Sequence, residues 1–501
     1  MTNKKILIPT GVPGLDEILL GGYCQTGFYL IQGDPGSGKT TLALQYVQGR
    51  RKAGESCLYV SLTETRADLE NTCASHGWSM EGIQLFDLTH SAANLSGQAQ
   101  PSVFHPSETE LGEVTQAIIS EVERVKPAHI VFDGLAELRL MSGDALRYRR
   151  QLLSLKAYFA ERNITVLCLD DRTFQMGEIQ PESLVGGNIV LERYLPDYGR
   201  ARRRLFVTKI RSSSFREGYH DYELVKGGVV VHPRLVAAEH HDRFSEETFP
   251  SGSKNLDQLF GGGISAGTTT LLIGPAGVGK STVSMLYVVE ALKRGIKASV
   301  YAFDEVLGTM LERTEKLCLG KPGGIRAFID EGLLHVQQID PAEMSAGAFS
   351  YEVRRAVEAG AKIILIDSLN GYLNAMPGEG YLTAHLHEMF AYLNQKGVAT
   401  IMVVAQHGMI AGAGKNVSEI DVSYLADSVL LFRYFESDAE IKQAVSVFKK
   451  RTGPHQRTIH QLSISSSGVK VGEALRGFSG IMTGVPEYSQ PLKISHEQTT
   501  K

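Results

Sequence analysis

The stretch that decides the fold is GPAGVGKST, residues 274–282. It matches G-x-x-x-x-G-K-[ST], a pattern in which glycines let backbone N–H groups turn toward phosphate oxygens. The β-rich run TTTLLIG at 268–274 leads into it, and STVSMLYVVEALKRG at 281–295 has the apolar spacing of a helix that ends at a glycine. A preceding strand and a following helix favour a phosphate loop over the alternative of an ordinary glycine turn.

The same pattern occurs earlier in the chain as GDPGSGKTT, residues 33–41. Its lysine, Lys39, lies 241 residues before Lys280, and Asp16 and Asp257 are separated by the same interval. A repeat of this length indicates duplicated domains rather than a solenoid. The chain is therefore predicted to contain two homologous units, each with its own phosphate loop.

Each loop predicts a set of nucleotide-binding residues. Backbone amides and the positive end of the following helix would hold the phosphates of ATP, and the lysine would reach the β- and γ-phosphates. The hydroxyl of Thr40 or Ser281 would ligate Mg²⁺. The predicted ATP-binding residues are Gly33, Asp34, Pro35, Gly36, Ser37, Gly38, Lys39, Thr40 and Thr41 in the first loop and Gly274, Pro275, Ala276, Gly277, Val278, Gly279, Lys280, Ser281 and Thr282 in the second.

The composition is that of a soluble globular protein, with 43% hydrophobic and 21% charged residues. A formal net charge of −4 gives no global attraction to nucleic acid or to an acidic membrane. The five cysteines form no C-x-x-C pair, which argues against a disulfide framework or a zinc site. No stretch approaches the ~20 apolar residues of a membrane span. We expect a cytoplasmic protein that binds neither nucleic acid nor a membrane.

Polar segments separate the predicted units. Residues 1–235 form the first expected domain, 236–248 a charged linker, 249–485 the second domain and 486–501 a short polar tail. Strand-like and helix-like runs alternate within each domain, which indicates a mainly parallel twisted sheet flanked by helices. The predicted fold class is α/β, with two tandem P-loop NTPase domains.

Two buried strand runs end in an acid. AHIVFDG ends at Asp133 and KIILIDS ends at Asp367. An acid at the carboxyl end of a parallel strand lies where α/β sheets bind ligands, and beside a phosphate loop it would hold Mg²⁺. Each acid alone could be an ordinary strand end, but the recurrence favours a metal role for both, together with Thr40 and Ser281.

A second pair of strand runs carries further acids. YVSLTET includes Glu64 after Thr63, and YAFDEVL includes Asp304 and Glu305 at the equivalent place. Hydrolysis needs a carboxylate to orient water, and transfer to a hydroxyl needs one to accept its proton. Glu64, Asp304 and Glu305 are therefore candidate catalytic residues, the alternative being a solvated acidic strand end.

GRARRRLFVTKIR at 199–211 is the one dense basic run. It could be a solvated hairpin, a nucleic-acid contact, or a source of cations that reach a neighbouring subunit's nucleotide. Lys209 and Arg211 recur as Lys449 and Arg451 without the surrounding arginines, which favours the third interpretation.

Taken together, the loops, acids and K-x-R pairs resemble the KaiC family, the circadian-clock ATPases and kinases of cyanobacteria, over about residues 7–485. The resemblance implies two RecA-like domains that bind ATP and Mg²⁺ at the subunit interfaces of a double-ring homohexamer. It implies slow hydrolysis in the first domain and serine/threonine autophosphorylation in the second. It assigns catalytic roles to Lys209, Arg211, Lys449 and Arg451, and suggests KaiB-like or other signalling partners.

The resemblance places phosphate acceptors in NVSEIDVSYLADS, residues 416–428. Ser423 stands where the family has its phosphorylated serine, Ser418 where it has a regulatory threonine, and Tyr424 replaces a phosphorylated threonine. Thr63 replaces an acid of the first domain, and the tail is shorter than the segment that recruits an activating partner in clock proteins. The alternative for 416–428 is a polar loop whose serines bond locally.

The expected function is therefore a hexameric ATPase with autokinase activity in the second domain, acting in signalling or timing. Two alternatives are a RecA- or DnaB-like nucleic-acid-dependent ATPase and a nucleotide-gated signalling scaffold without kinase activity. The negative net charge and the scarcity of aromatic residues within the basic run, which contains only Phe206, argue against nucleic acid.

Overall fold

The computed structural model describes residues 6–89, 106–172, 181–211, 213–239, 243–244, 246–318, 322–340, 342–374, 382–406, 423–437, 439–465, 468–481 and 487–488. The chain divides into two compact units. Unit 1 comprises residues 1–196 and 200–234, and unit 2 comprises 197–199 and 235–501. Within the described ranges, no helix is long and apolar enough to cross a membrane.

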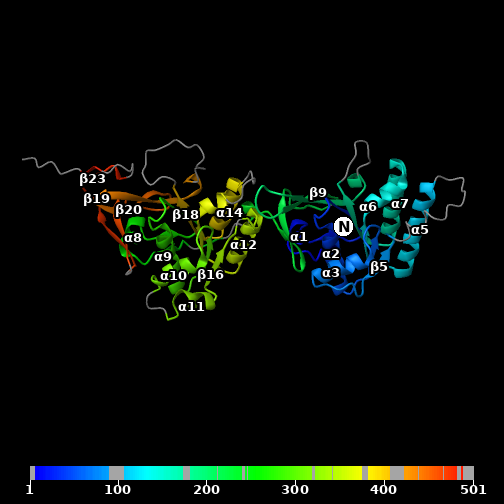
Figure 1. Ribbon diagram of the computed structural model, residues 1–501, viewed down its shortest axis with the longest axis horizontal. Coiled ribbons are helices and arrows are strands. Elements are labelled where there is room, and N and C mark those ends of the chain that lie inside the picture. The colour runs from blue at the N-terminus through cyan, green and yellow to red at the C-terminus, as the bar shows by residue number, and fades with distance from the viewer. Residues whose placement is uncertain are drawn as a thin grey trace, which may run out of the picture. The chain divides into compact units, whose positions relative to one another are not determined.

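Unit 1 is built on a nine-stranded sheet with the order β11-β10-β9-β8-β3-β7-β6-β4-β5 (Figure 1). Neighbouring strands from β8 to β5 are parallel, whereas β8 to β11 form an antiparallel meander at one side. The strands are β3 (Phe28–Gly33), β4 (Cys57–Ser61), β5 (Gln84–Asp87), β6 (His129–Asp133), β7 (Thr165–Asp171), β8 (Gly187–Tyr194), β9 (Arg202–Ile210), β10 (His220–Val225) and β11 (Gly228–His232). The helices are α1 (Leu15–Ile18), α2 (Lys39–Lys52), α3 (Arg66–Ser75), α5 (Pro106–Val125), α6 (Leu135–Ser142) and α7 (Ala145–Glu161), with a 3₁₀ turn η1 (Pro181–Ser183).

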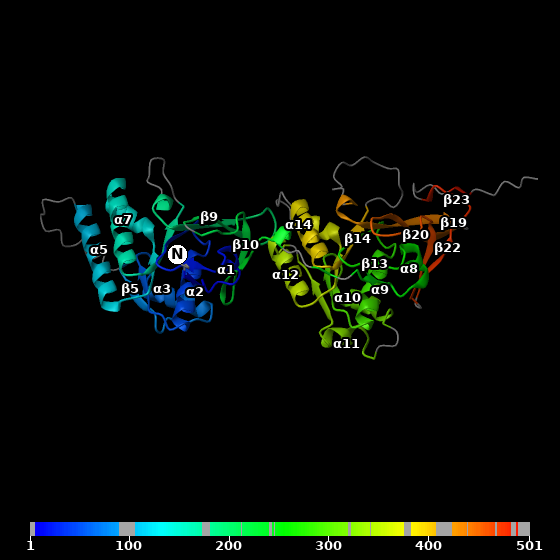
Figure 2. The same cartoon turned by 180° about the vertical axis from the view of Figure 1, so that it is seen from behind.

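Unit 2 repeats this topology in the order β16-β15-β17-β18-β14-β19-β20-β21-β22 (Figure 2). Its strands are β14 (Thr269–Gly274), β15 (Ala298–Ala302), β16 (Leu334–Gln338), β17 (Ile363–Asp367), β18 (Ala399–Ala405), β19 (Ser428–Ser437), β20 (Glu440–Lys450), β21 (His460–Ser465) and β22 (Gly468–Ala474). Its helices are α8 (Lys254–Phe260), α9 (Lys280–Lys293), α10 (Leu307–Glu315), α11 (Gly324–Asp330), α12 (Ala346–Glu358), α13 (Leu369–Asn374) and α14 (Leu382–Gln395), with 3₁₀ turns η2 (Ala237–Glu239) and η3 (Ser423–Leu425). Two-residue strand pairs complete the units: β1 (Leu7–Ile8) with β2 (Tyr23–Cys24), β12 (Thr248–Phe249) with β13 (Ile264–Ser265), and β23 (Phe478–Ser479) with β24 (Glu487–Tyr488).

Helices cover both faces of each sheet because the central strands are apolar on both faces. In β6, Val131 packs in the cluster that contains Leu42 of α2, and Ile130 packs in the cluster that contains Phe159 of α7. Neighbouring side chains of a strand point to opposite faces, so a continuous apolar run needs two helix layers to bury it. Two mostly parallel sheets with flanking helices confirm the predicted α/β fold class of two RecA-like P-loop domains.

The order of the strands places the phosphate loop at a switch point. β3 lies between β7 and β8. The chain passes from β3 to β4 on one side of the sheet, whereas it passes from β7 to β8 across β3 to the other side. Ligands of open α/β sheets bind at the carboxyl ends of the strands at such a point. β14, between β18 and β19, has the same position in unit 2.

Segments assigned to the linker and the tail also contribute to unit 2. Ala237 of η2 is buried, and its N–H donates to Glu388 Oε2 of α14 at 3.2 Å. Glu487 and Tyr488, within the predicted tail, form β24. The four domain ranges derived from the sequence stay predictions.

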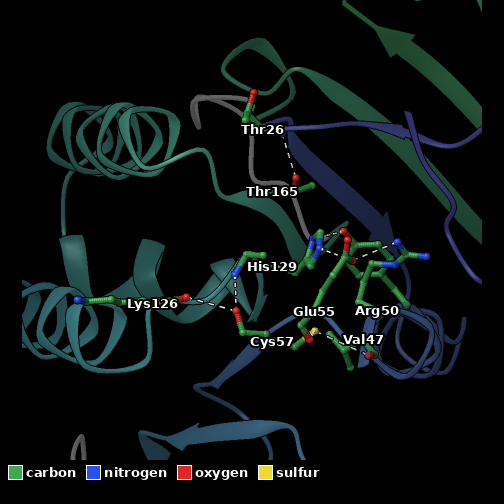
Figure 3. Close-up of polar contacts among 11 residues, drawn as sticks. Thr26, Val47, Arg50, Glu55, Cys57, Lys126, His129 and Thr165 are labelled. Carbon is green, nitrogen blue, oxygen red and sulfur yellow. Dashed lines mark hydrogen bonds and ion pairs between the residues drawn. The ribbon is translucent and has the colours of Figure 1, made fainter. Parts of the chain in front are cut away.

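The amino-terminal edge of the unit 1 sheet carries a buried polar network (Figure 3). His129, at the start of β6, has Nδ1 2.8 Å from the Tyr46 hydroxyl and Nε2 2.9 Å from Glu55 Oε2. Arg50 Nη1 lies 3.2 Å from the same Glu55 oxygen. Ile363 starts the equivalent strand β17, so the imidazole has no counterpart at that position of unit 2.

Candidate functional site

In unit 1 the predicted phosphate loop links β3 to α2. Gly36 and Gly38 have φ values of 75° and 101°, which side chains rarely tolerate. A Cβ on Gly33 would lie 2.5 Å from the carbonyl oxygen of Leu191, so only glycine lets the loop leave the sheet here. The loop therefore holds its backbone amides around the N-terminus of α2, the arrangement that binds phosphate.

Unit 2 has the same loop between β14 and α9. Gly277 and Gly279 have φ values of 77° and 99°, and a Cβ on Gly274 would lie 2.6 Å from the carbonyl oxygen of Phe432. The repeat extends to backbone conformation, not only to sequence. Both loops fit the triphosphate of ATP.

The loop lysines have different surroundings. Lys39 Nζ donates to the carbonyl oxygens of Gly33 and Asp34 at 2.8 and 3.2 Å and also lies 2.7 Å from Asp171 Oδ1. Lys280 Nζ donates to the carbonyls of Gly274 and Pro275 at 2.8 and 2.6 Å.

Lys280, the loop lysine of unit 2, is buried. Removal from water lowers the pKa of Lys280 to about 8, although the charge of Asp367 opposes this shift. A phosphate would therefore meet a lysine paired with a carboxylate in the first loop and a lysine bonded to loop carbonyls in the second.

Each predicted metal-binding acid contacts the loop hydroxyl of its own unit. Thr40 Oγ1 donates to Asp133 Oδ2 at 3.2 Å, and the Tyr59 hydroxyl donates to the same oxygen at 2.6 Å. Ser281 hydrogen-bonds Asp367 in unit 2, and burial raises the pKa of both acids. These hard oxygen donors fit Mg²⁺, which takes one or two protein ligands and completes its shell with water and phosphate.

The described residues contain no cluster of three or more His, Cys, Asp or Glu side chains that could hold a metal by themselves. An Mg²⁺ ion shared with the nucleotide needs no such cluster.

The first unit has one acid beside this site. Glu64 is half-buried, and burial raises its pKa, with added effects from the negative charges of Asp133 and Asp68. Its hydrogen bond with Thr40 opposes the shift. Glu64 thus lies beside Thr40 and Asp133, while Thr63 is exposed and offers no carboxylate. The catalytic role of Glu64 stays a prediction.

The second unit has two acids, and both have partners. Asp304 Oδ2 accepts a short hydrogen bond from the hydroxyl of Ser368, the residue after Asp367. Glu305 Oε1 lies 2.7 Å from Arg313 Nη1 of α10. The Nε and Nη2 groups of Arg313 are buried without a hydrogen-bond partner in the described part of the chain. Arg313 also lies close enough to lower the pKa of Asp367.

The K-x-R pairs lie away from the loops of their own units. In the sheet, Lys209 is opposite Asn188, which is level with Leu30 of β3. Gly33 is three residues further along, roughly 10 Å at the rise of a strand. Arg211 lies further still, because its N–H donates to Gly186 before β8 begins.

The basic side chains bind backbone carbonyls or acids near the start of β8 or β19. Lys209 Nζ makes a short hydrogen bond to the Glu182 carbonyl, and Arg211 Nη2 donates to Ser183 O at 3.1 Å. Lys449 Nζ donates to Ala426 O at 2.7 Å, and Arg451 Nη1 lies 3.3 Å from Asp427 Oδ1. The structure does not bring these residues together with the loop of the same unit.

The phosphoacceptor segment is only partly described. Ser423 is the first residue of η3, and Tyr424 after it is exposed. Ser418 lies outside the described residues.

Sequence reasoning missed four residues at these sites: Tyr59, Asp171, Arg313 and Ser368. The repeat held a usable signal for one of them, because Asp171 ends β7 opposite Gly33, whereas Ala405 ends β18 opposite Gly274. A polar residue in only one copy of a repeat marks a difference between the sites.

A family model described as "ATPase: KaiC" matches residues 8–236 and again residues 249–476. The chain belongs to the KaiC family. Two domains of this ATPase family thus lie in tandem, as the resemblance in the sequence predicted.

Curated KaiC relatives align along nearly the whole chain. The "Circadian clock protein KaiC3" of Synechocystis sp. is 24% identical over 494 residues, covering 97% of this chain and 96% of the relative. The "Circadian clock oscillator protein KaiC" of Parathermosynechococcus lividus is 24% identical over 499 residues, covering 95% and 87%. The protein of the same name from Prochlorococcus marinus (strain MIT 9313) is 24% identical over 505 residues, covering 96% and 95%.

Membership of the KaiC ATPase family implies that the chain binds ATP and Mg²⁺ in the general manner of P-loop enzymes.

Proposed function

We propose that this KaiC-family ATPase is a cytoplasmic homohexamer that binds ATP at its subunit interfaces and acts in signalling or timing. Unit 1 hydrolyses ATP slowly, and unit 2 transfers the γ-phosphate to its own Ser423 and, more weakly, to Ser418. KaiB-like or other signalling proteins would read the state of the ring.

The observation that carries the kinase proposal is the pair of acids in unit 2. Asp304 and Glu305 follow β15 beside Asp367, whereas unit 1 has Glu64 alone in the equivalent place. Transfer to a hydroxyl needs a base for the hydroxyl proton in addition to the groups that hold Mg²⁺. Asp304 already accepts a hydrogen bond from a serine hydroxyl, that of Ser368, so its carboxylate is accessible to a group of the acceptor's kind.

The position of the K-x-R pairs supports shared sites. Lys209 and Arg211 lie toward the amino ends of the parallel strands, and the loop of their unit lies at the carboxyl ends. Cations that stabilise the transferring phosphate must approach it directly. A role for these residues, and for Lys449 and Arg451, therefore requires the nucleotide of a neighbouring subunit.

The experiment that tests the kinase is intact-mass analysis after incubation with Mg-ATP, followed by mapping of the modified residues. Phosphate on Ser423, less on Ser418 and little on Tyr424 is expected. Asp304→Asn combined with Glu305→Gln should abolish the modification and leave ATP binding intact, because the amides keep the shape and lose the base. The matched control, Glu64→Gln in unit 1, should leave phosphate on Ser423.

The proposal predicts modification within residues 416–428. Phosphate found only elsewhere, or none after long incubation, would contradict autokinase activity and leave the family ATPase activity untouched. Equal loss in the Glu64→Gln control would show that the acids of unit 2 have no special part.

A further inference from the structure

We propose that Asp171 is a positioning residue of the first site, where its carboxylate competes with the phosphates of ATP for Lys39 and weakens ATP binding relative to a neutral residue. Among the described residues, the second site has no such competitor. The inference rests on the proposed use of Lys39 to bind ATP.

The geometry places Asp171 directly beside the phosphate loop. It is the last residue of β7, in register with Gly33 at the end of β3, and its Oδ1 lies 2.7 Å from Lys39 Nζ. The Lys39 side chain is 11% exposed and that of Asp171 is 42% exposed. The cation is therefore largely enclosed, while the anion that holds it is partly open to solvent.

Asp171 is held in place by its neighbour in the strand. Asp170 is fully buried and forms a short ion pair with Arg139. Arg139 belongs to α6, which begins two residues after Asp133. The end of β7 is thus tied to the helix that follows the proposed metal-binding acid, which fixes the backbone from which Asp171 reaches Lys39.

Gln32, on the strand that enters the loop, lies in register with Asp170, and its Oε1 accepts a hydrogen bond from Asn188 at 3.0 Å. Burial raises the pKa of Asp170 to about 6, and the charge of Arg139 opposes the shift. The pair Asp170–Arg139 therefore keeps most of its ionic character at neutral pH, which favours a fixed geometry at the end of β7.

Unit 2 replaces this polar set with apolar side chains. Ala405 occupies the register position of Asp171, and Val404 precedes it. Ile273 replaces Gln32, and Leu373 stands where Arg139 would fall, six residues after the metal-binding acid. Among the described residues, Lys280 donates only to loop carbonyls.

The cost of the competitor is electrostatic. A phosphate that binds Lys39 must displace or share Asp171, and a carboxylate left beside the γ-phosphate repels it. Partial exposure of Asp171 screens this repulsion, so the effect is smaller than for a buried charge. We expect Asp171→Asn to tighten ATP binding about tenfold.

The test measures the dissociation constant for ATP by calorimetry on the full chain in a Lys280→Ala background, so that binding reports the first site. Asp171→Asn should bind about tenfold more tightly, a gain that loss of a merely structural residue does not produce. The matched control is Glu70→Gln on α3, which removes an exposed carboxylate from the same unit and should leave the constant unchanged.

The converse variant gives an independent readout. Ala405→Asp in a Lys39→Ala background should weaken ATP binding at the second site by a similar factor. This arm also decides the proposal if Asp171→Asn lowers the folded fraction, which thermal unfolding would reveal.

The outcomes separate this inference from the function on which it rests. ATP binding that persists in the Lys39→Ala, Lys280→Ala double variant would overturn the assignment of the loops themselves. If the double variant loses ATP binding but Asp171→Asn leaves the affinity unchanged or lowers it, the inference alone is overturned. A lowered affinity would mean that Asp171 holds Lys39 in position for phosphate.

Discussion

Glu305 and Glu64 occupy equivalent positions, but only Glu305 has a cation beside it. Arg313 Nη1 lies 2.7 Å from Glu305, and in unit 1 the residue at the matching interval is Thr72. The guanidinium compensates the acids of the second site from within the same unit, and its unpartnered buried Nε and Nη2 groups face no hydrogen-bonding group among the described residues. The two sites therefore differ in charge at positions that no loop motif contains.

This difference leads to a prediction for Arg313→Gln. Without the cation, Mg²⁺ meets the full negative charge of Asp367 and Glu305, so a several-fold lower Mg²⁺ concentration should give half-maximal ATP binding at the second site. A magnesium titration of ATP binding in a Lys39→Ala background measures the shift. The control is Arg326→Gln, an exposed arginine of α11. An unchanged midpoint would mean that Arg313 does not affect the metal-binding acids.

At the scale of elements, β6 and β17 have equivalent positions in their sheets, but different side chains hold their amino-terminal ends. Both end in the acid proposed to bind Mg²⁺, but β6 begins at His129 within a polar network and β17 begins at an aliphatic residue. Tyr287, the counterpart of Tyr46, has a buried hydroxyl without a hydrogen-bond partner among the described residues. The amino end of the first sheet is therefore held by groups that can titrate.

Burial lowers the pKa of His129 below its ordinary value of 6.5, although Glu55 opposes the shift. The folded unit thus excludes a proton that the unfolded chain binds, so this contribution to stability is present above about pH 6.5 and is lost as the pH falls, by at most ~1.4 kcal/mol per pH unit. Calorimetric unfolding of unit 1 between pH 7.5 and 5.5 measures it.

His129→Gln is the matched variant, because an amide donates and accepts without titrating. It should lower the stability at pH 7.5 by about 1 kcal/mol and flatten the pH dependence. Parallel profiles for the wild type and the variant would assign the pH dependence to other groups.

At the scale of the whole molecule, the catalytic role proposed for the K-x-R pairs requires more than one chain. Their position at the far ends of the strands from the loops means that an isolated subunit cannot bring Lys209 to its own nucleotide along the sheet. We predict that Lys209→Ala with Arg211→Ala lowers ATPase activity by a factor of about 10³, the scale measured for trans-acting cations, and leaves ATP binding largely intact.

Mixed rings test this geometry. Chains carrying Lys39→Ala have intact K-x-R residues, and chains lacking Lys209 and Arg211 have an intact first loop. Mixing the two should restore part of the ATPase activity, because some interfaces then combine both intact halves. Mixtures as inactive as the separate variants would contradict catalysis across the interface.

The sequence by itself determined the tandem arrangement, both phosphate loops, and the acids at the ends of their strands. These features are predictable because each is local. A loop such as 274–282 contains its glycines, lysine and hydroxyl in one contiguous segment, and an acid like Asp133 or Asp367 is found by the apolar strand that ends at it. Because the two loops recur at an interval of 241 residues, neither loop is an accidental match to the pattern.

Only the tertiary structure decided which further residues distinguish the two sites. Asp171 reaches Lys39 because β7 inserts beside β3 in the sheet, and strand order is not a property of either segment alone. Arg313 lies only eight residues after Glu305, and the two meet because α10 holds Arg313 beside the acid that follows β15. Lys209 lies away from its own loop because β9 runs antiparallel to β8, which reverses the direction of the chain. Contacts between strands that are distant in the sequence depend on the packing of the entire sheet. For this physical reason, local sequence patterns do not predict them.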